Sequence, residues 1–290
     1  MKQPLRKDLE PVATSFSVKE LVEPHFDPNW HFHPHYQLFL VEKGTGTRFI
    51  GDSIKPFGPG DLVFLGPNLP HLWRSDQAYF AKQSTLKTKG IVVYFTNDFL
   101  GTEFFGKQEM GPLRQLLEHA RQGLEWTEPT RQRVAMTLRH LASQPATFER
   151  ILILLTLLND LSHAVDYQYL TSPGYTNTVK PTETDRMQLV HDYVLGHFPD
   201  DISLDTVADL AGMTSPAFCR YFKARANKTF SEFVSEVRIG HACKLLMNGK
   251  LTITQISFES GFRTLSNFNR QFKDITNQTP SAYVKTYRQL

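Results

Sequence analysis

The first hundred residues of the chain contain short apolar runs separated by turn residues. Four such runs are Gln37–Glu42, Arg48–Ile50, Asp61–Leu65 and Ile91–Phe95. Glycine and proline cluster between them, for example over residues 58–60, which is typical of turns between strands. Several short strands at close spacing predict an antiparallel closed barrel or sandwich and not a parallel sheet.

From about Pro112 the apolar positions take a helical spacing. Leu113, Leu116 and Leu117 stand at i, i+3 and i+4. Residues Ile151–Leu161 are apolar on most faces, so we expect a buried helix that packs either within its own domain or at a dimer interface. This run is too short to cross a bilayer, which predicts no contact with a membrane.

A stretch of little periodicity over residues 169–183 marks the boundary between two domains, because its glycine and prolines interrupt regular structure. The pattern predicts an N-terminal domain over residues 1–172, a linker over 173–182 and a C-terminal domain over 183–290. The predicted fold class is α+β multidomain, with an N-terminal antiparallel β-barrel and flanking helices followed by an all-α domain.

The C-terminal segment repeats itself. Aligned at an offset of 50 without a gap, residues 216–238 match residues 266–288, and nine of the 23 pairs are identical. Upstream the offset is 49, which pairs Gly212 with Gly261. Chance would give roughly one or two identities, so the chain carries a duplicated module.

Each copy of the module has the layout of a helix-turn-helix. In the first copy a helix over Leu204–Ala211 ends at Gly212, where a residue that adopts positive φ favours the turn. A second helix follows Thr214, whose hydroxyl suits an N-cap. The second copy repeats this layout with a helix over Ile253–Ser260, then a glycine, and Thr264 as the cap.

A helical wheel divides the second helix of each copy into an apolar and a polar face. The inward positions are phenylalanines, namely Phe218, Phe222, Phe268 and Phe272. The outward positions are Arg220, Lys223, Asn227, Ser266, Arg270, Lys273 and Asn277. Such residues suit the major groove, because arginine pairs with guanine and asparagine with adenine. The alternative is a solvated helix face, which two copies with Arg, Lys and Asn at the same positions disfavour.

The charge distribution supports this interpretation. From residue 212 to residue 290 there are twelve lysines and arginines against four acidic residues, a surplus of eight, whereas the whole chain carries +3. A basic end on a nearly neutral chain is expected of a phosphate-binding surface, although charge alone also fits a basic solvated surface.

The composition, with 40% hydrophobic and 12% aromatic residues, is that of a globular protein. Cys219 and Cys243 are too few for a disulfide framework, which favours a reducing compartment. Residues 1–12 lack the apolar core of a signal peptide. We therefore expect a cytoplasmic protein.

The duplicated module resembles the DNA-binding domain of the AraC/XylS family of transcription regulators. The resemblance covers residues 185–288 and is strong from Ile256 through Gly261-Phe262 and the Arg-Gln-Phe-Lys at 270–273 to Tyr283. It implies two recognition helices, joined by a linking helix over residues 230–247, that enter successive major grooves. The DNA-binding residues expected from it are Ser215, Pro216, Cys219, Arg220, Lys223, Leu265, Ser266, Asn267, Asn269, Arg270 and Lys273. Because proline and cysteine hydrogen-bond poorly, the second unit is expected to read more bases than the first.

Histidines are the candidate chemistry of the N-terminal domain. His31 and His33 begin a predicted strand, on which alternate side chains share a face, and His71 follows a turn-rich segment. The sequence leaves three interpretations of these histidines open. They bind a metal ion, they line a metal-free pocket, or they lie in the core or in solvent without contacting a ligand.

This segment resembles the cupin barrel with which many AraC/XylS proteins sense small molecules. His31, His33, Gln37 and His71 match the positions where metal-binding cupins carry His, His, Glu and His, but the neutral Gln37 is a weaker ligand than a carboxylate. The predicted ligand-binding residues are these four with Trp30 and Trp73, and we expect no cofactor. The resemblance suggests a sugar-like ligand.

These patterns predict a one-component transcription regulator. Its expected partners are double-stranded DNA, a small-molecule effector, a second copy of the chain in a homodimer and, for an activator, RNA polymerase. The alternative is a metal-dependent cupin enzyme with a helical appendage, against which Gln37 argues.

Overall fold

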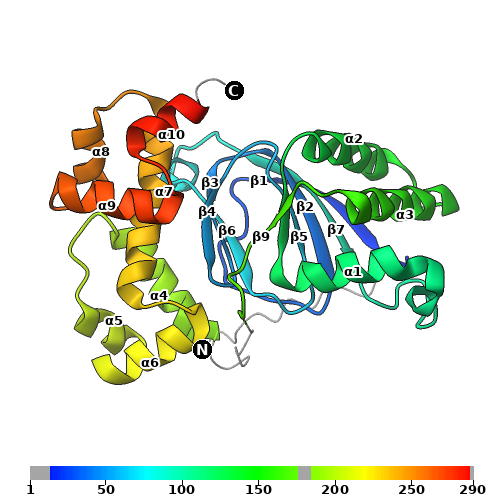
Figure 1. The fold of residues 1–290 in the computed structure, drawn as a ribbon, viewed down its shortest axis with the longest axis horizontal. Helices are drawn as coiled ribbons and strands as arrows, with labels where there is room; N and C mark the ends of the chain where they lie inside the picture. The colour runs from blue at the N-terminus through cyan, green and yellow to red at the C-terminus, as the bar shows by residue number, and fades with distance from the viewer. Residues whose placement is uncertain (1–13, 176–183, 288–290) are drawn as a thin grey trace. The chain divides into compact units, whose positions relative to one another are not determined.

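The protein is described from a computed structural model, which covers residues 14–175 and 184–287 of the 290-residue chain (Figure 1). The chain divides into two compact units, one formed largely by residues 14–175 and the other by residues 184–287. Most of the predicted linker over 173–182 lies outside the described residues, as does Arg288 of the repeat, so the bounds of the linker stay a prediction. None of the described helices has both the length and the apolar character of a membrane span.

The described strands of the first unit form two sheets. The larger sheet is antiparallel, with the strand order β1-β7-β2-β5-β8-β9, and the smaller has the order β4-β3-β6. The strands are β1 (Ser17–Glu23), β2 (Tyr36–Lys43), β3 (Gly46–Ile50), β4 (Ser53–Phe57), β5 (Leu62–Leu65), β6 (His71–Ser75), β7 (Thr88–Phe95), β8 (Leu124–Trp126) and β9 (Tyr167–Tyr169). The four predicted runs fall on β2, β3, β5 and β7, and the predicted antiparallel architecture is confirmed.

The central strands of the larger sheet are buried on both faces. On β2, Leu38 and Leu40 belong to the apolar cluster beneath the helices, whereas Phe39 and Val41 belong to the cluster between the two sheets. Because side chains alternate along a strand, each central strand contributes to both clusters. This explains why these strands appear in the sequence as nearly continuous apolar runs.

The two sheets face each other without the hydrogen-bonded closure of the expected barrel. Among the described residues, an isolated bridge pairs His31 with His71 outside the strand ladders of the two sheets. The sequence pattern specifies which side of a strand is buried, and this is the same in a closed barrel and in two packed sheets. The sequence therefore predicts the layers but not whether the edges of the sheets meet.

Three α-helices cover the outer face of the larger sheet (Figure 1). They are α1 (Gly111–His119), α2 (Thr130–Ser143) and α3 (Phe148–His163), and short 3-10 helices lie at Gln77–Phe80, Phe104–Gly106, Gln108–Met110 and Ala120–Gln122. The predicted apolar helix corresponds to α3, of which Leu154, Leu157, Leu158 and Leu161 are buried. Its remaining apolar positions include the exposed Phe148 and Leu152, so only one side of α3 belongs to the core.

The second unit is all-α, as predicted. Its helices are α4 (Thr184–His197), α5 (Leu204–Leu210), α6 (Ser215–Ala226), α7 (Phe230–Asn248), α8 (Ile253–Glu259), α9 (Leu265–Thr276) and α10 (Pro280–Tyr287). The duplication is visible in these bounds, because α8 begins 49 residues after α5, and α9 and α10 begin 50 residues after α6 and α7.

Candidate nucleic-acid interface and effector pocket

The two helix-turn-helix turns have the same backbone structure. Gly212 and Gly261 adopt positive φ values of 65° and 83° at equivalent positions. The amide of Met213 donates to the carbonyl of Ala208 at 2.9 Å, and the equivalent amide of Phe262 donates to Ser257 at 3.1 Å. Both turns therefore end the first helix in the same way and start the second helix in the same direction.

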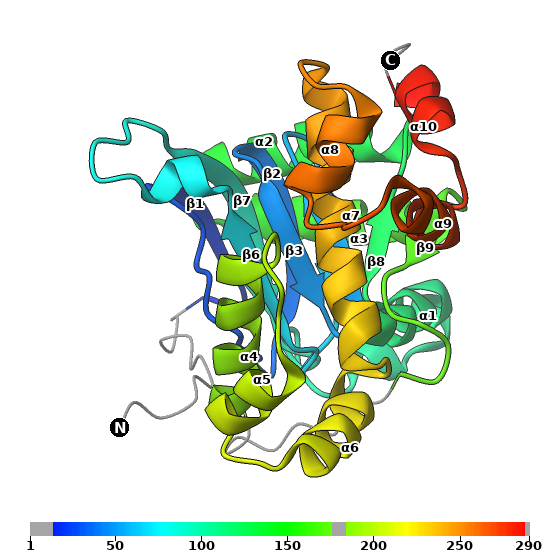
Figure 2. The same cartoon turned by 90° about the vertical axis from the view of Figure 1, so that its left-hand side faces the viewer.

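A long central helix, α7, packs against both second helices. In the first copy Phe222 of α6 packs edge-on against Phe230 and Phe233 of α7, with ring centroids 5.5 Å and 5.2 Å away. In the second copy Phe268 and Phe272 of α9 share a cluster with the far end of α7, which contributes Ile239, Ala242, Cys243 and Leu246. The four predicted inward phenylalanines are fully buried. Figure 2 shows α6 and α9 near opposite ends of α7, and this helix fixes their separation.

The predicted DNA-binding residues lie mostly on the surface of these helices. Ser215 is half-buried, and its hydroxyl donates to the carboxylate of Asp205. The other ten are exposed, namely Pro216, Cys219, Arg220, Lys223, Leu265, Ser266, Asn267, Asn269, Arg270 and Lys273. The structure thus brings five of the predicted residues together on α6 and six on α9.

The start of α9 is more ordered by hydrogen bonds than the start of α6. The hydroxyl of Thr264 accepts from the amide of Asn267 at 3.3 Å, whereas the equivalent Thr214 makes no such capping bond. The Arg270 guanidinium donates to Oδ1 of Asn267 at 3.1 Å. This contact restrains the Arg270 side chain, and a restrained arginine loses less conformational entropy when it binds a base.

Two asparagines have a different role from the one their wheel positions suggest. Asn227 and Asn277 end α6 and α9 in the left-handed conformation, with φ values of 54° and 57°. Asparagine tolerates this conformation better than most residues, which explains its presence in both copies. These two residues therefore cap the C-terminal ends of α6 and α9, which corrects their assignment to the groove-facing stripe.

Several basic residues of the C-terminal unit contact the protein itself. Arg238 donates to the carbonyls of Phe198 and Asp200, both at 2.8 Å. Arg225 lies over the ring of Tyr221, and Lys228 pairs with Glu236 at 2.7 Å. The surplus of positive charge counted in the sequence therefore overstates the charge that the two second helices present to a phosphate backbone.

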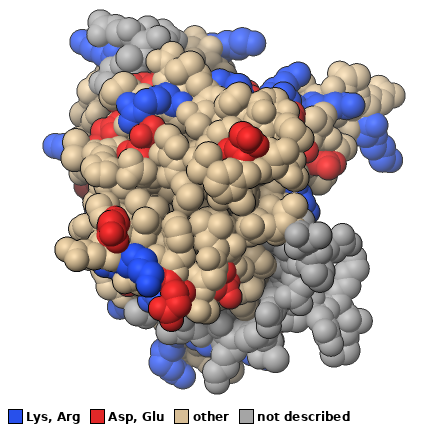
Figure 3. Space-filling view, turned by 90° about the vertical axis from the view of Figure 1, so that its right-hand side faces the viewer, with Lys and Arg blue, Asp and Glu red and all other residues tan. Residues whose placement is uncertain are grey.

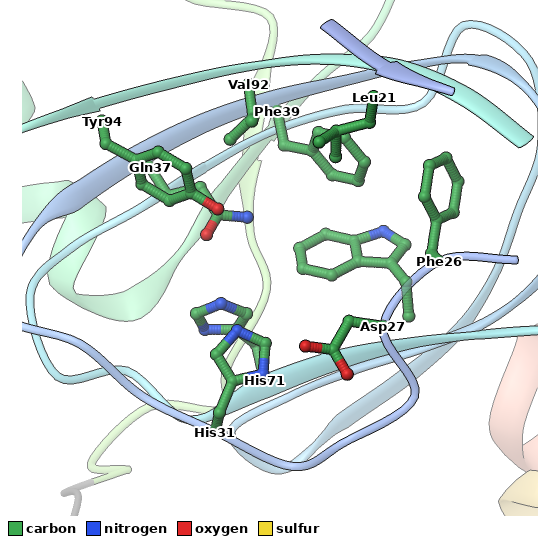
Figure 4. Close-up of a pocket in the computed structure, with 10 residues that line it drawn as sticks. Leu21, Phe26, Asp27, His31, Gln37, Phe39, His71, Val92 and Tyr94 are labelled. Atoms are coloured by element: carbon green, nitrogen blue, oxygen red, sulfur yellow. The ribbon is translucent and has the colours of Figure 1, made fainter. Parts of the chain in front are cut away.

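A cavity of about 60 Å³ lies in the first unit between the two sheets (Figure 4). Of the residues predicted to bind a ligand, His31, Gln37, His71 and Trp73 line it. Trp30 and His33 are buried but do not line it. Six further lining residues are not among the predicted ones, namely Leu21, Phe26, Asp27, Phe39, Val92 and Tyr94. Strand alternation and register give a partial signal for them, because Phe39 stands two positions after Gln37 on β2 and Tyr94 pairs with Gln37 across the sheet.

The three predicted histidines converge although His33 does not lie on a strand. His31 and His71 exchange backbone hydrogen bonds of 3.1 Å and 2.9 Å, which places their ring centroids 4.5 Å apart. His33 lies in the loop before β2, a correction to the predicted strand, and its ring centroid is 5.0 Å from that of His71. One possible ligand atom from each histidine lies within 4.8 Å of those of the other two.

The hydrogen bonds of this histidine cluster determine what it can bind. Nδ1 of His31 and Nδ1 of His71 each lie 2.7 Å from a backbone carbonyl, the arrangement that orients metal-bound imidazoles. The fourth position is occupied by Gln37, whose amide oxygen lies 2.9 Å from Nε2 of His33. Burial lowers the pKa of His33 to about 4. The cluster therefore fits a neutral polar lining as it stands, and a metal ion would have to replace the contact between His33 and Gln37.

Comparisons with known families match both regions. The model of the cupin domain matches residues 18–78, which include the histidine cluster and most residues of the cavity. The model of the helix-turn-helix domain matches residues 207–286, which include α6 and α9.

The chain is also similar to curated regulators and to a solved structure. An uncharacterised HTH-type transcriptional regulator from Staphylococcus aureus is 29% identical over 150 residues, which are 52% of this chain and 19% of that protein. The HTH-type transcriptional regulator YdeC from Bacillus subtilis, also uncharacterised, is 31% identical over 100 residues, 34% of each chain. The match thus spans about a fifth of the first relative and a third of the second. The structure of ToxT from Vibrio cholerae with a bound unsaturated fatty acid is 17% identical, with 93% of this chain and 94% of that chain covered and a TM-score of 0.35.

Proposed function

We propose that this chain is a sequence-specific DNA-binding transcription regulator of the AraC/XylS type, controlled by a small molecule, because a match to the cupin domain is followed by a match to the helix-turn-helix domain. The duplicated helix-turn-helix, with α6 and α9 held on one central helix, is the observation that carries the proposal. The related proteins are described as transcriptional regulators, which favours this function over a cupin enzyme. We propose that it acts in the cytoplasm, with RNA polymerase as a further partner if the regulator activates transcription.

We propose that the cupin domain binds the effector in the cavity between its two sheets. The cavity combines aromatic side chains with His31, Gln37 and His71, which is typical of small-molecule sites. The effector controls DNA binding only if it binds more tightly to one arrangement of the protein than to the other.

The DNA-binding proposal is tested by two substitutions on α9. Duplex sites are first selected from a random library with the wild-type protein, and affinities for a selected and a scrambled site are then measured at fixed salt. Arg270→Ala is expected to weaken binding to the selected site roughly tenfold to a hundredfold and to change binding to the scrambled site little, because a bidentate arginine contact discriminates bases by about 1–3 kcal/mol. Equal losses on the two sites would make Arg270 a phosphate contact.

Lys273→Ala serves as the matched control, since Lys273 lies in the last turn of the same helix. It is expected to weaken binding to both sites by a similar factor and to reduce the dependence on salt by about one phosphate contact. Failure of the wild-type protein to select any sequence would contradict the proposed function itself.

We propose a homodimer formed through α2 and α3 of the first unit. Met136, Phe148 and Leu152 are 59%, 67% and 47% exposed there, although they are apolar. Figure 3 shows broad uncharged areas between scattered charged side chains on the face of the first unit that carries these helices. A second copy of the same face matches such a surface, because a two-fold contact places equivalent apolar residues together.

Leu152→Glu is expected to raise the dimer dissociation constant at least about tenfold, since it places a carboxylate in an apolar interface. Sedimentation velocity over a range of concentrations measures this change. Val22→Glu is the control, because Val22 on β1 is an equally exposed aliphatic residue outside α2 and α3. The interface is wrong if both variants sediment like the wild type or if the wild type is monomeric at all concentrations.

A further inference from the structure

Three aromatic side chains form walls of the cavity in the cupin domain. The rings of Phe26 and Phe39 meet edge to face, with centroids 5.3 Å apart and planes at 82°. Phe39 and Trp73 meet in the same way at 4.9 Å and 87°. Aromatic walls that meet at nearly right angles are the kind of cage that surrounds a compact cationic group.

A fourth aromatic residue, Tyr94, completes the lining opposite the histidines (Figure 4). It lies on β7 directly across from Gln37 of β2, so the register of the sheet fixes its position. Its ring centroid is 5.3 Å from that of His33, and the two rings pack edge to face. Burial, and then the neighbouring Asp27 carboxylate, raise the pKa of the Tyr94 phenol, so its hydroxyl keeps its proton at neutral pH.

The lining contains one carboxylate. Asp27 is the only carboxylate among the ten residues that line the cavity, and the lining contains no lysine or arginine. One oxygen of Asp27 is held in place by the backbone amide of Asn29 at 3.1 Å and by its side-chain amide at 2.6 Å. Figure 4 shows the carboxylate beside His31 and His71, on the side of the cavity across from Phe39 and Val92. An anionic ligand such as a fatty acid would meet this carboxylate, and the lining has no lysine or arginine to bind the anion.

We propose that the effector of this cavity is a small organic cation, held through an ammonium or methylated ammonium head group by Asp27 and the aromatic walls. Aromatic faces attract such cations through the negative charge of the π system, and the attraction increases when water is excluded. The volume of about 60 Å³ admits a compact head group and is far below the roughly 300 Å³ at which pockets for drug-sized ligands begin. This assignment rests on the proposed sensing function of the cupin domain, and it replaces the sugar-like ligand suggested by the resemblance.

The test compares ligands of equal shape and different charge on the full-length protein in buffer with EDTA. Choline is the cationic probe, 3,3-dimethyl-1-butanol is its neutral isostere, 3,3-dimethylbutyrate is an anion with the same branched head, and glucose is a neutral sugar. Affinity is measured by calorimetry and by tryptophan fluorescence, which reports on Trp73 in the cavity wall. Choline is expected to bind at least roughly tenfold more tightly than each of the others.

Variants test the two parts of the site separately. Asp27→Asn is expected to weaken choline binding roughly tenfold, while Asp98→Asn, at an exposed carboxylate outside the cavity, leaves it unchanged. Phe26→Leu keeps apolar volume but removes one aromatic wall, and it is expected to weaken choline more than the neutral isostere. Thermal unfolding of each variant establishes that it folds.

Two results would overturn the ligand class. One is that choline does not bind at millimolar concentration, and the other is that the neutral or anionic probe binds at least as tightly. Selection of DNA sites by the same preparation is measured independently of these probes, so a failed ligand assignment and a failed DNA-binding function are distinguishable.

Discussion

Arg48→Met is expected to lower the free energy of unfolding of the cupin domain by about 3–5 kcal/mol, the usual loss when one partner of a buried ion pair is removed. Arg48 is 2% exposed on β3, where it pairs with Asp61 at 2.9 Å and with Glu125 of β8. Burial lowers the pKa of Arg48, but the two carboxylates outweigh this effect, so the net shift is upward. The ion pairs connect the smaller sheet to the larger one, and the variant leaves two nearly buried carboxylates without their cation.

Urea unfolding followed by tryptophan fluorescence measures this change selectively. The three tryptophans, Trp30, Trp73 and Trp126, all lie in the first unit, so the signal does not depend on the helical domain. The control adds Asp61→Asn and Glu125→Gln to the same variant, which removes both uncompensated charges and is expected to recover a large part of the lost stability. A loss below about 1 kcal/mol in the single variant would show that water reaches the carboxylates and replaces Arg48.

Local sequence signals were sufficient to predict the helix-turn-helix units. The turn glycines, the threonines that precede the second helices and the buried phenylalanines all stand within a few residues of the backbone they specify, and each occurs in both copies. The structure accordingly begins α6 and α9 directly after Thr214 and Thr264. Periodicity alone cannot separate a surface residue from a helix cap, so it assigns Asn227 and Asn277 to the DNA-facing stripe.

The cavity was predictable only in part, because its lining comes from segments far apart in the chain. The histidines and Gln37 were identified from their residue types and spacing, but Asp27 and Phe26 lie in the loop after β1 and carry no pattern of their own. Their position depends on the packing of two sheets against each other, and the sequence did not establish even whether those sheets close. The same limit applies to Arg48, whose two partners lie 13 and 77 residues further along the chain.

Arg238 illustrates how a count of charges can be misinterpreted. It contributes to the basic C-terminal surplus, yet its guanidinium donates to two backbone carbonyls of the loop between α4 and α5. Its guanidinium also lies 5.9 Å from the ring centroid of Phe262, next to the turn of the second helix-turn-helix. Arg238 therefore holds this loop against the second turn, and Gly261 lies at the point of contact.

Gly261→Ala is expected to destabilise the second helix-turn-helix by about 2–5 kcal/mol, whereas Gly212→Ala at the equivalent turn is expected to cost about 1–2 kcal/mol. Both glycines have positive φ, which costs alanine about 1–2 kcal/mol. Only at Gly261 does the added Cβ also meet the backbone, 2.6 Å from the carbonyl oxygen of Phe198 and 2.9 Å from Cα of Pro199. Displacing packed backbone adds about 1–3 kcal/mol, while a Cβ at Gly212 has no neighbour within 4 Å.

Hydrogen exchange in the full-length protein measures the local free energy of opening, in peptides from α8 and α9 for Gly261→Ala and in peptides from α5 and α6 for Gly212→Ala. Because the two substitutions carry the same backbone strain, the difference between them isolates the contact with the α4–α5 loop. Gly261→Ala is also expected to reduce binding to a selected DNA site more than Gly212→Ala does, since α9 is the helix with the larger set of hydrogen-bonding groups. Equal destabilisation by the two variants would mean that the loop moves aside at little cost and that Arg238 does not fix the position of the second turn.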